Sequence, residues 1–364
     1  MSNPNTEIKR GLEGVVVDTT AISLVDGENG VLSYRGVSID DLVERPFAEI
    51  ASLVVDGDFS NRITREAEGR TDLSPRERAL VRSLPAETHP MHVLQGITPL
   101  LDRSGAFEDR GDAAQGFAIA AKLPALVATH LRGDHLNPSD CDDPALRFLE
   151  LIGAPDTDIA RKAYSVTQIL QLEHSFNAST FVARACASTL APVENALSAA
   201  FGTLHGVLHG GADQAALETA DQVGCPEKAA AFVDEFLATK TKVMGMGHRE
   251  YKVLDPRARY LKALAADLCA DTPHEQTYLT LVAIEDRFIE RMAEDGKSLY
   301  ANLEFYKGVI YRTLGIPTPF FTANFALSRV YGYLDHFTES RAVNRLLRPK
   351  ALYVGNPVTR AATG

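Results

Sequence analysis

Several features that mark specialised proteins are absent from this chain of 364 residues. The four cysteines, Cys141, Cys186, Cys225 and Cys269, are widely spaced and form no CxxC pair. That spacing argues against a zinc ribbon and indicates reduced thiols, as in a cytosolic protein. No run of 18 apolar residues occurs, so no transmembrane helix is expected. The N-terminal residues are polar and contain no apolar signal segment, and we expect a cytoplasmic protein.

Long basic runs are also missing, and the formal net charge is −11. A surface for nucleic acid or for an anionic membrane is therefore not expected, although a local basic patch could still bind a small anion. Hydrophobic residues make up 45% of the chain, which is enough for a substantial core. The length predicts two domains, or one large domain with a smaller partner.

Turn and capping signals predict a mainly helical chain. Two apolar segments flank a turn-rich pentapeptide at 26–30, so we predict a β-hairpin over 20–34. Apolar residues at helical spacing predict a helix over 273–293, and Pro192 opens another that runs to Leu204. The expected helix N-caps are Ser38, Ser74, Asp255 and Thr272. The predicted fold class is all-α.

Two histidines next to glycines stand out as candidates for chemistry. His209 lies in Leu-His-Gly-Gly, and His248 follows Gly-Met-Gly. Glycine lets the backbone approach a ligand closely, and the imidazole can then project into a cleft. The basic residues Arg249, Lys252 and Arg257 follow His248, and they suit a phosphate or a carboxylate.

A larger set of motifs, in a fixed order along the chain, carries a family resemblance. These motifs are 173–180 (Glu-His-Ser-Phe-Asn-Ala-Ser-Thr), 208–211 (Leu-His-Gly-Gly), 244–249 (Met-Gly-Met-Gly-His-Arg), 255–257 (Asp-Pro-Arg), 305–306 (Phe-Tyr), 314–317 (Leu-Gly-Ile-Pro) and 348–349 (Arg-Pro). In this order they are specific, and over nearly the whole chain the sequence resembles the citrate synthase family.

The resemblance implies a fold and a reaction. A large helical domain would comprise 1–211 and 306–364, and a smaller helical domain, 212–305, would close over the substrates. The reaction would condense acetyl-CoA with oxaloacetate, giving citrate and CoA. Propionyl-CoA, which would give 2-methylcitrate, remains an open alternative, because one methylene in an apolar pocket changes binding by only about 1–3 kcal/mol. The CoA thioester is a substrate, and no cofactor or metal ion is implied.

The same resemblance implies roles for individual residues. His209 would stabilise the enolate, Glu304 would be the base that forms it, and His248 would polarise the ketone. The oxo acid would be held by His174, Arg257 and Arg329, with Arg348 reaching in from a neighbouring subunit. That last role requires a homodimer. CoA would contact Met246, Gly247, Arg249 and Lys252.

Three positions depart from the family pattern. Glu304 stands where the family has aspartate, and its carboxylate reaches about 1.5 Å further. Ser175 replaces a common acidic residue after His174, and Tyr333 stands where tryptophan is common. Since a misplacement near 1 Å costs on the order of 10²-fold in rate, Glu304 implies an adapted cleft, a different substrate or slow turnover.

Two other functional classes fit parts of the sequence. A metallohydrolase could use His205, His209, His248 and Glu304, but the glycines after His205 and His209 argue against the continuous helix that an i, i+4 zinc pair needs. A weakly active or non-catalytic paralogue, which binds the same ligands, rests on Glu304 alone. His205 itself could contact CoA or face solvent.

Overall fold

The predicted helices are present in the computed structural model, which describes residues 8–60, 71–102, 111–133, 135–248 and 250–356. The α-helices there are α1 (Ile39–Leu42), α2 (Phe47–Asp56), α4 (Pro75–Arg82), α5 (Pro90–Ile97), α6 (Asp112–Arg132), α7 (Pro144–Ile152), α8 (Asp158–Gln171), α9 (Ala178–Ser188), α10 (Val193–Leu204), α11 (Ala212–Val223), α12 (Ala229–Ala238), α13 (Ala258–Cys269), α14 (Glu275–Glu294), α15 (Leu303–Thr313) and α16 (Phe321–Ala342). Short 3₁₀ helices are η1 (Arg10–Leu12), η2 (Thr98–Leu100), η3 (Pro226–Lys228) and η4 (Thr318–Phe320). The all-α prediction is confirmed.

The predicted hairpin is also confirmed, and a third strand extends it. Strand β1 (Ser23–Asp26) pairs antiparallel with β2 (Val31–Tyr34), and β2 pairs with β3 (Val37–Ser38). The carboxylate of Asp26 accepts hydrogen bonds from the backbone N–H groups of Glu28 and Asn29, which shapes the turn.

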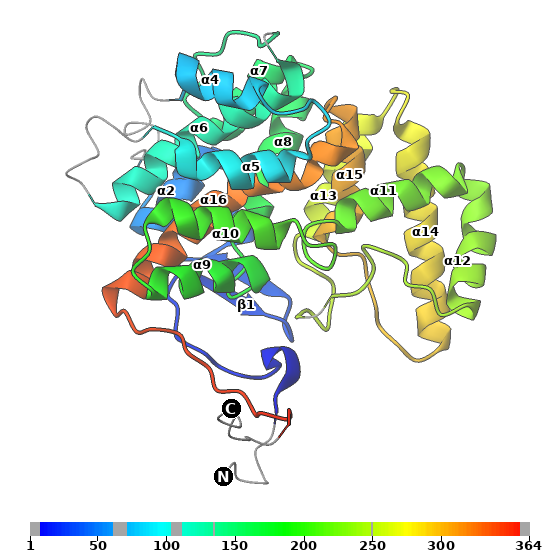
Figure 1. The fold of residues 1–364 in the computed structure, drawn as a ribbon. Coiled ribbons are helices and arrows are strands. Elements are labelled where there is room, and N and C mark those ends of the chain that lie inside the picture. Colours follow the sequence, from blue (N-terminus) through cyan, green and yellow to red (C-terminus); the bar gives the residue numbers. More distant parts are fainter. Residues whose placement is uncertain (1–7, 61–70, 103–110, 134, 249, 357–364) are drawn as a thin grey trace, which may run out of the picture.

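Helix α16 runs through the middle of the larger group of helices (Figure 1). It packs against α2, α6, α8, α9 and α10, and most of its residues are buried on every side. A helix buried all round needs no polar face, yet α16 carries Arg329, Asp335 and His336 in its interior. Buried charges of this kind require partners, and those partners lead into the candidate site.

Helices α11 to α15 gather at one side of the molecule (Figure 1). Helix α15 packs against α11 and α13, and α13 also contacts α8 of the larger group. The chain order of this side group agrees with a smaller unit near 212–305. The division of the chain at those residues remains a prediction.

Two of the four predicted caps hold as predicted. Ser38 caps α1, and Ser74 forms a full capping box with Glu77 at the start of α4. Thr272 does not cap α14, which begins at Glu275, because its hydroxyl accepts from His274 N, one residue before the helix, while it donates to the Cys269 carbonyl. Asp255 does not cap α13 either, since Arg257 occupies the cap position and the carboxylate of Asp255 binds the Arg257 guanidinium.

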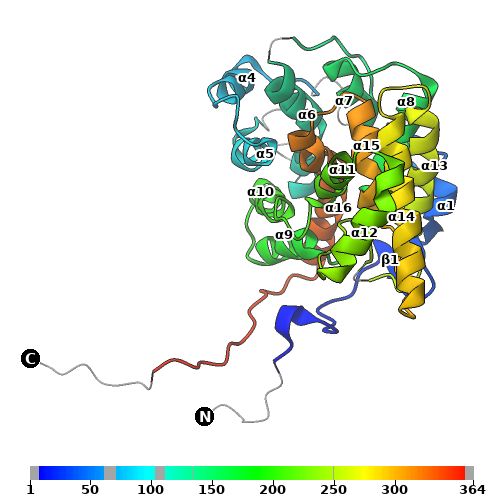
Figure 2. The ribbon, with the colours of Figure 1, turned by 90° about the vertical axis from the view of Figure 1, so that its right-hand side faces the viewer.

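Both ends of the chain leave the helical body as arms (Figure 2). The C-terminal arm follows α16 without regular structure, and Tyr353 and Val354 on it are 74% and 87% exposed. On the N-terminal side Val16 is 88% exposed. Within the described ranges, no helix combines the length and apolarity needed to cross a membrane.

Candidate active site

The loop that carries His248 is tied to the segment just before α15. Gly245 and Gly247 both have positive φ, +79° and +81°, a conformation that favours glycine. The Gly245 carbonyl accepts from Asn302 N at 2.9 Å, and Gly247 N donates to the Tyr300 carbonyl at 2.7 Å. The Asn302 amide also donates to the Gly247 carbonyl at 3.0 Å. His248 and the N-terminus of α15 are thus held as one unit.

The turn of the N-terminal hairpin holds the other side of this loop. Lys252 N donates to the Gly27 carbonyl at 2.8 Å, and a Cβ atom at Gly27 would lie 2.1 Å from the Glu250 carbonyl oxygen. Only glycine permits that approach without a shift of the backbone. The hairpin therefore helps to fix the His248 loop.

The backbone sets the tautomer of His248. Its Nδ1 atom accepts from Glu250 N at 3.0 Å and from Tyr251 N at 3.2 Å. A neutral ring whose Nδ1 accepts must carry its hydrogen on Nε2. Burial, and then the charge of Arg257, lower the pKa of His248, so the ring is neutral at pH 7. His248 is therefore a hydrogen-bond donor through Nε2.

Arg257 lies beside this donor and is anchored by Asp255. The guanidinium donates to Asp255 through Nε and Nη2, both at 2.9 Å, and Nη2 is 3.4 Å from His248 Nε2. Burial alone would raise the pKa of Asp255, but Arg257 more than offsets it and the pKa is lowered. Since both nitrogens carry hydrogen, they do not bond each other, and both can donate to one oxygen atom.

His174 lies across from His248, with ring centroids 5.6 Å apart. Its Nε2 atom is 3.2 Å from the Tyr251 hydroxyl. Burial, followed by the charge of Arg257, lowers the pKa of His174 well below its ordinary value. The His174 ring, like that of His248, is therefore neutral and suited to hydrogen bonding.

A buried network supports the backbone at His174. The Glu173 carboxylate accepts from Ser23 Oγ at 3.0 Å, lies 3.1 Å from His336 Nε2 of α16, and also accepts from Ser175 N. Ser175 has φ +50°, a strained conformation for a residue other than glycine. A serine whose N–H folds back onto Glu173 explains how the chain turns sharply after His174.

His209 is held by a serine that the sequence reasoning did not single out. Ser179 Oγ of α9 lies 2.7 Å from His209 Nε2 and accepts from the Tyr333 hydroxyl at 2.7 Å. Burial lowers the pKa of His209 to about 4, and the charge of Arg329 adds to that shift. Ser179 lies inside the quoted Asn-Ala-Ser-Thr motif, but nothing in the sequence indicated which of its hydroxyls would meet His209.

Glu304 is the second residue of α15, where Asn302 Oδ1 accepts its backbone N–H at 3.0 Å. A helix N-terminus favours an ionised carboxylate. Burial lowers the pKa values of both His209 and His248, and the negative charge of Glu304 opposes both shifts. The carboxylate is therefore within electrostatic reach of both histidines, one from each glycine-containing break.

Of the remaining predicted site residues, Arg329 lies near this group and Arg348 does not. Arg329 is 2% exposed, its Nε donates to the Gln171 carbonyl at 2.6 Å, and its charge lowers the pKa values of His174 and His209. Arg348 lies on the exposed C-terminal arm and bonds the carbonyl of Pro349 at 3.3 Å.

The residues assigned to CoA are spread along the His248 loop. Met246 forms an isolated bridge with Ala301, Gly247 is the glycine described above, and Lys252 is exposed beyond Tyr251. Arg249 lies outside the described residues. A phosphate contact at Lys252 is compatible with its exposure.

The metallohydrolase alternative finds no support in the geometry. The ring of His205 stacks on that of His89, with centroids 4.3 Å apart, and lies edge-on to His92, with centroids 4.9 Å apart. Among the described residues, no group of three or more His, Cys, Asp or Glu side chains could hold a metal ion. Residues 205–211 are not helical, so the i, i+4 pair is not on a helix face.

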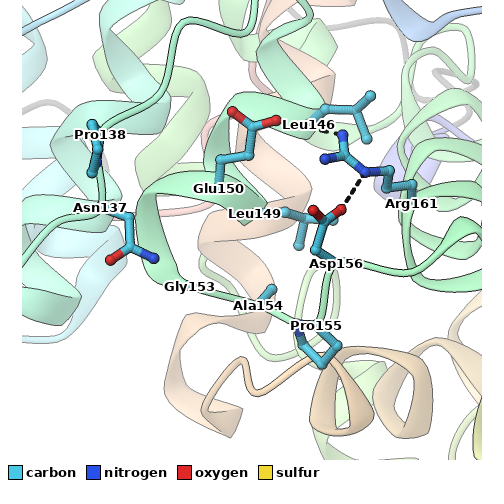
Figure 3. Close-up of a pocket in the computed structure, with 10 residues that line it drawn as sticks. All are labelled: Asn137, Pro138, Leu146, Leu149, Glu150, Gly153, Ala154, Pro155, Asp156 and Arg161. Carbon is cyan, nitrogen blue, oxygen red and sulfur yellow. Dashed lines mark hydrogen bonds and ion pairs between the residues drawn. The ribbon is translucent and has the colours of Figure 1, made fainter.

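A hollow of about 300 Å³ lies elsewhere, between the end of α7 and the start of α8 (Figure 3). Arg161 at its edge pairs with Asp156 at 2.6 Å and with Glu150 at 3.4 Å. Its charged side chains are engaged in these ion pairs, and none of the predicted site residues lines this hollow.

Comparison with known proteins decides the family. Residues 11–350 match the family described as "Citrate synthase, C-terminal domain". The chain belongs to the citrate synthase family. It is an enzyme of the citrate synthase type. A citrate synthase from Synechocystis is 36% identical, with 98% of this chain and 93% of the relative covered. A 2-methylcitrate synthase from Shewanella oneidensis is 34% identical, with 98% and 97% covered.

Solved structures of citrate synthases have the same fold. The enzyme from Pyrobaculum aerophilum superposes with a TM-score of 0.89 at 31% identity, covering 99% of this chain and 96% of that one. A ternary complex of the Thermoplasma acidophilum enzyme with carboxymethyl coenzyme A and oxaloacetate gives 0.88 at 28% identity, with 98% of each chain covered.

Proposed function

We propose that this enzyme condenses acetyl-CoA with oxaloacetate and then hydrolyses the thioester, releasing citrate and CoA. The first step removes a proton from the methyl group next to the thioester. Glu304 is the base, and His209 donates a hydrogen bond to the thioester oxygen as negative charge develops there. With a pKa of about 4, His209 is neutral at pH 7, and it donates through the ring nitrogen that carries its single hydrogen. The Ser179 hydroxyl has one hydrogen and lies 2.8 Å from Asn177 Oδ1 as well as 2.7 Å from His209 Nε2; when it donates to Nε2, the ring hydrogen resides on Nδ1.

The second step joins the enolate carbon to the keto carbon of the oxo acid. His248 Nε2 and Arg257 Nη2, 3.4 Å apart, together donate to the ketone oxygen as it becomes an alkoxide. His174 and Arg329 hold the carboxylates of the oxo acid, to which forked guanidinium donors are well suited. The alkoxide then takes up a proton to become the hydroxyl group of the product, Glu304 releases the proton it took, and water cleaves the thioester, which releases CoA as its thiol.

One observation carries this proposal most strongly: the Asn302 side chain bonds both the Gly247 carbonyl, next to His248, and the backbone N–H of Glu304, each at 3.0 Å. A thiol-release assay on the native chain, Glu304→Asp and Glu304→Gln tests it. We expect Glu304→Gln to lose at least about 10²-fold in kcat, because general base catalysis typically contributes 10²–10⁴-fold. A Gln variant at the native rate would show that Glu304 is not the base.

A second acyl substrate remains open, and the similarity to a 2-methylcitrate synthase favours testing it. Propionyl-CoA differs by one methylene, which changes discrimination by about 1–3 kcal/mol. The ratio of kcat/KM for acetyl-CoA and propionyl-CoA decides between the two. Inactivity with every acyl-CoA of such a panel would contradict the catalytic proposal as a whole.

We propose a homodimer in which Arg348 completes the neighbouring site, and the exposed side chains of the C-terminal arm support it. Arg348 lies on an exposed segment with Leu346, Tyr353 and Val354, which are 57%, 74% and 87% exposed. Apolar side chains on an extended arm favour burial against another surface. Co-expression of Glu304→Gln with Arg348→Ala is a direct test, since a mixed dimer regains one complete site. Activity above that of both parents is expected, and a mixture no better than its parents would contradict the exchange.

We also propose that 212–305 moves as a unit and that the enzyme is cytoplasmic. The two substrate-facing groups of this segment, His248 and Glu304, share the loop contacts at Asn302, so they would travel together. Closure would exclude water during enolisation. Crystals with and without oxaloacetate should differ by a rotation of this segment.

The proposed cytoplasmic location agrees with the four cysteines, which are free, as a reducing compartment requires. Cell fractionation tests the location.

A further inference from the structure

A buried ion pair lies beside the proposed reaction groups, and no step of the reaction uses it. Lys307 Nζ of α15 is 3.3 Å from Asp213 Oδ2 of α11, and both side chains are 0% exposed. Lys307 Nζ also donates to Gln171 Oε1 at 3.3 Å and lies 4.3 Å from the centre of the Phe325 ring. Fully buried charges are costly unless paired, so this arrangement calls for an explanation.

The pair joins the two segments that carry the proton donor and the base. Asp213 stands in the first turn of α11, directly after the His209-Gly210-Gly211 break. Lys307 lies one helical turn beyond Glu304. A Cβ atom at Gly308 would lie 2.8 Å from the Asp213 carbonyl oxygen, so the two helices are in close contact here.

The same lysine is connected to the proposed oxo-acid arginine. Gln171, at the end of α8, accepts from Lys307 through its side chain and from Arg329 Nε through its backbone carbonyl at 2.6 Å. The Gln171 amide in turn donates to the Tyr311 hydroxyl of α15 at 2.9 Å. Gln171 therefore fixes Lys307 and Arg329 relative to each other.

We infer that the Asp213–Lys307 pair is a positioning device that sets the distance between His209 and Glu304, and this inference rests on the proposed function. A hydrophobic contact between α11 and α15 would allow small sliding, whereas Lys307 Nζ lies between Asp213 Oδ2 and Gln171 Oε1, 3.3 Å from each, so a shift of either helix would lengthen one of these contacts. Because a 1 Å misplacement can cost on the order of 10²-fold, such a constraint matters most for a base with a long side chain like Glu304.

The charges around the pair also couple it to His209. The groups around it are His209 before α11, Glu304 and Tyr311 on α15, and Arg329 on α16, whose charge acts on His209. Burial lowers the pKa of His209, and the charges of Arg329 and Lys307 lower it further, whereas Glu304 opposes the shift. Burial raises the pKa of Asp213, and Lys307 opposes that rise.

Three variants separate positioning from plain stability: Asp213→Asn, Lys307→Met and the two combined. Each single change leaves one buried charge unpaired, so both should unfold at lower temperature, while the double variant should recover most of the loss. We expect the double variant to keep kcat about 10- to 100-fold below native, with KM for the oxo acid within about threefold. The matched control is the buried pair Lys122–Glu77, 2.7 Å apart on α6 and α4, whose double replacement by Met and Gln should leave kcat at the native value.

A second readout does not depend on turnover. NMR titration of the histidine rings should give a higher pKa for His209 in Lys307→Met and a lower one in Asp213→Asn. The lysine charge lowers the pKa of His209 in the native chain, so its removal raises that pKa, and loss of the Asp213 charge leaves the lysine unopposed. A native chain inactive with every acyl-CoA would refute the proposed function, and the titration would still decide the present inference. A stable double variant with native kcat, or an unchanged His209 pKa in both single variants, overturns the inference.

Discussion

Replacing Asp255 by asparagine tests the anchoring of Arg257 in the site. The Asp255 carboxylate accepts from Arg257 N at 3.0 Å, from Nε and Nη2 at 2.9 Å each, and from Leu303 N at 3.2 Å. Asparagine preserves the shape but removes the charge, which leaves a guanidinium that is 3% exposed without a counter-ion. Removal of one partner of a buried pair costs about 3–5 kcal/mol, so we expect a loss of that size in the free energy of unfolding.

Urea unfolding followed by circular dichroism at pH 7 measures this loss. The matched control is Asp234→Asn, because Asp234 pairs with Arg287 through two oxygens on the surface and should leave the midpoint nearly unchanged. The folded-state pKa of Asp255 is below its ordinary 3.8, so its contribution is complete above pH 3.8 and is lost as pH falls through the folded value. The native and variant stabilities should therefore converge in strong acid. A loss below about 1 kcal/mol at pH 7 would refute the reasoning about this pair.

Two further predictions concern His209. Ser179→Ala removes the hydroxyl that lies 2.7 Å from His209 Nε2. We expect kcat to fall by about 10- to 100-fold while KM for the oxo acid stays within about twofold. A native kcat in steady-state assays would contradict this anchoring of His209. The folded-state pKa of His209 is about 4 against 6.5, so the unfolded chain binds the proton more tightly and stability falls as pH drops from 6.5 to 4. That shift corresponds to roughly 3 kcal/mol. Between pH 7 and pH 4, denaturation experiments should therefore show that the native chain loses more stability than His209→Gln by this amount. Equal losses in the two proteins would contradict the prediction.

The sequence predicted local structure well where a residue acts on its own neighbours. Ser74 and Glu77 form the predicted capping box because both partners lie within one turn. Asp255 looked like the same device, and its carboxylate does accept from Arg257 N, but that N–H precedes α13, and the same carboxylate also binds the Arg257 guanidinium and Leu303 N. The cap prediction fails here because the carboxylate also binds the side chain of Arg257, two residues further along the chain.

Candidate site residues were accessible from the sequence, whereas their supports were not. The rings of His174 and His248 lie 5.6 Å apart, the charge of Glu304 acts on both His209 and His248, and glycine patterns and the family resemblance pointed to all four. Ser179 was missed because its contact with His209 joins α9 to the loop after α10. Contacts of that kind depend on how helices cross, which no periodicity in the sequence specifies.

The docking of the hairpin turn on the His248 loop has a consequence for folding. Gly27 is synthesised early, but its partners at Glu250 and Lys252 emerge from the ribosome only much later. The entropy of closing so long a loop must be overcome before the contact stabilises anything, and contacts between distant residues slow folding. The His248 loop should therefore become ordered among the last parts of the protein, so the fold can form before the enzyme is active.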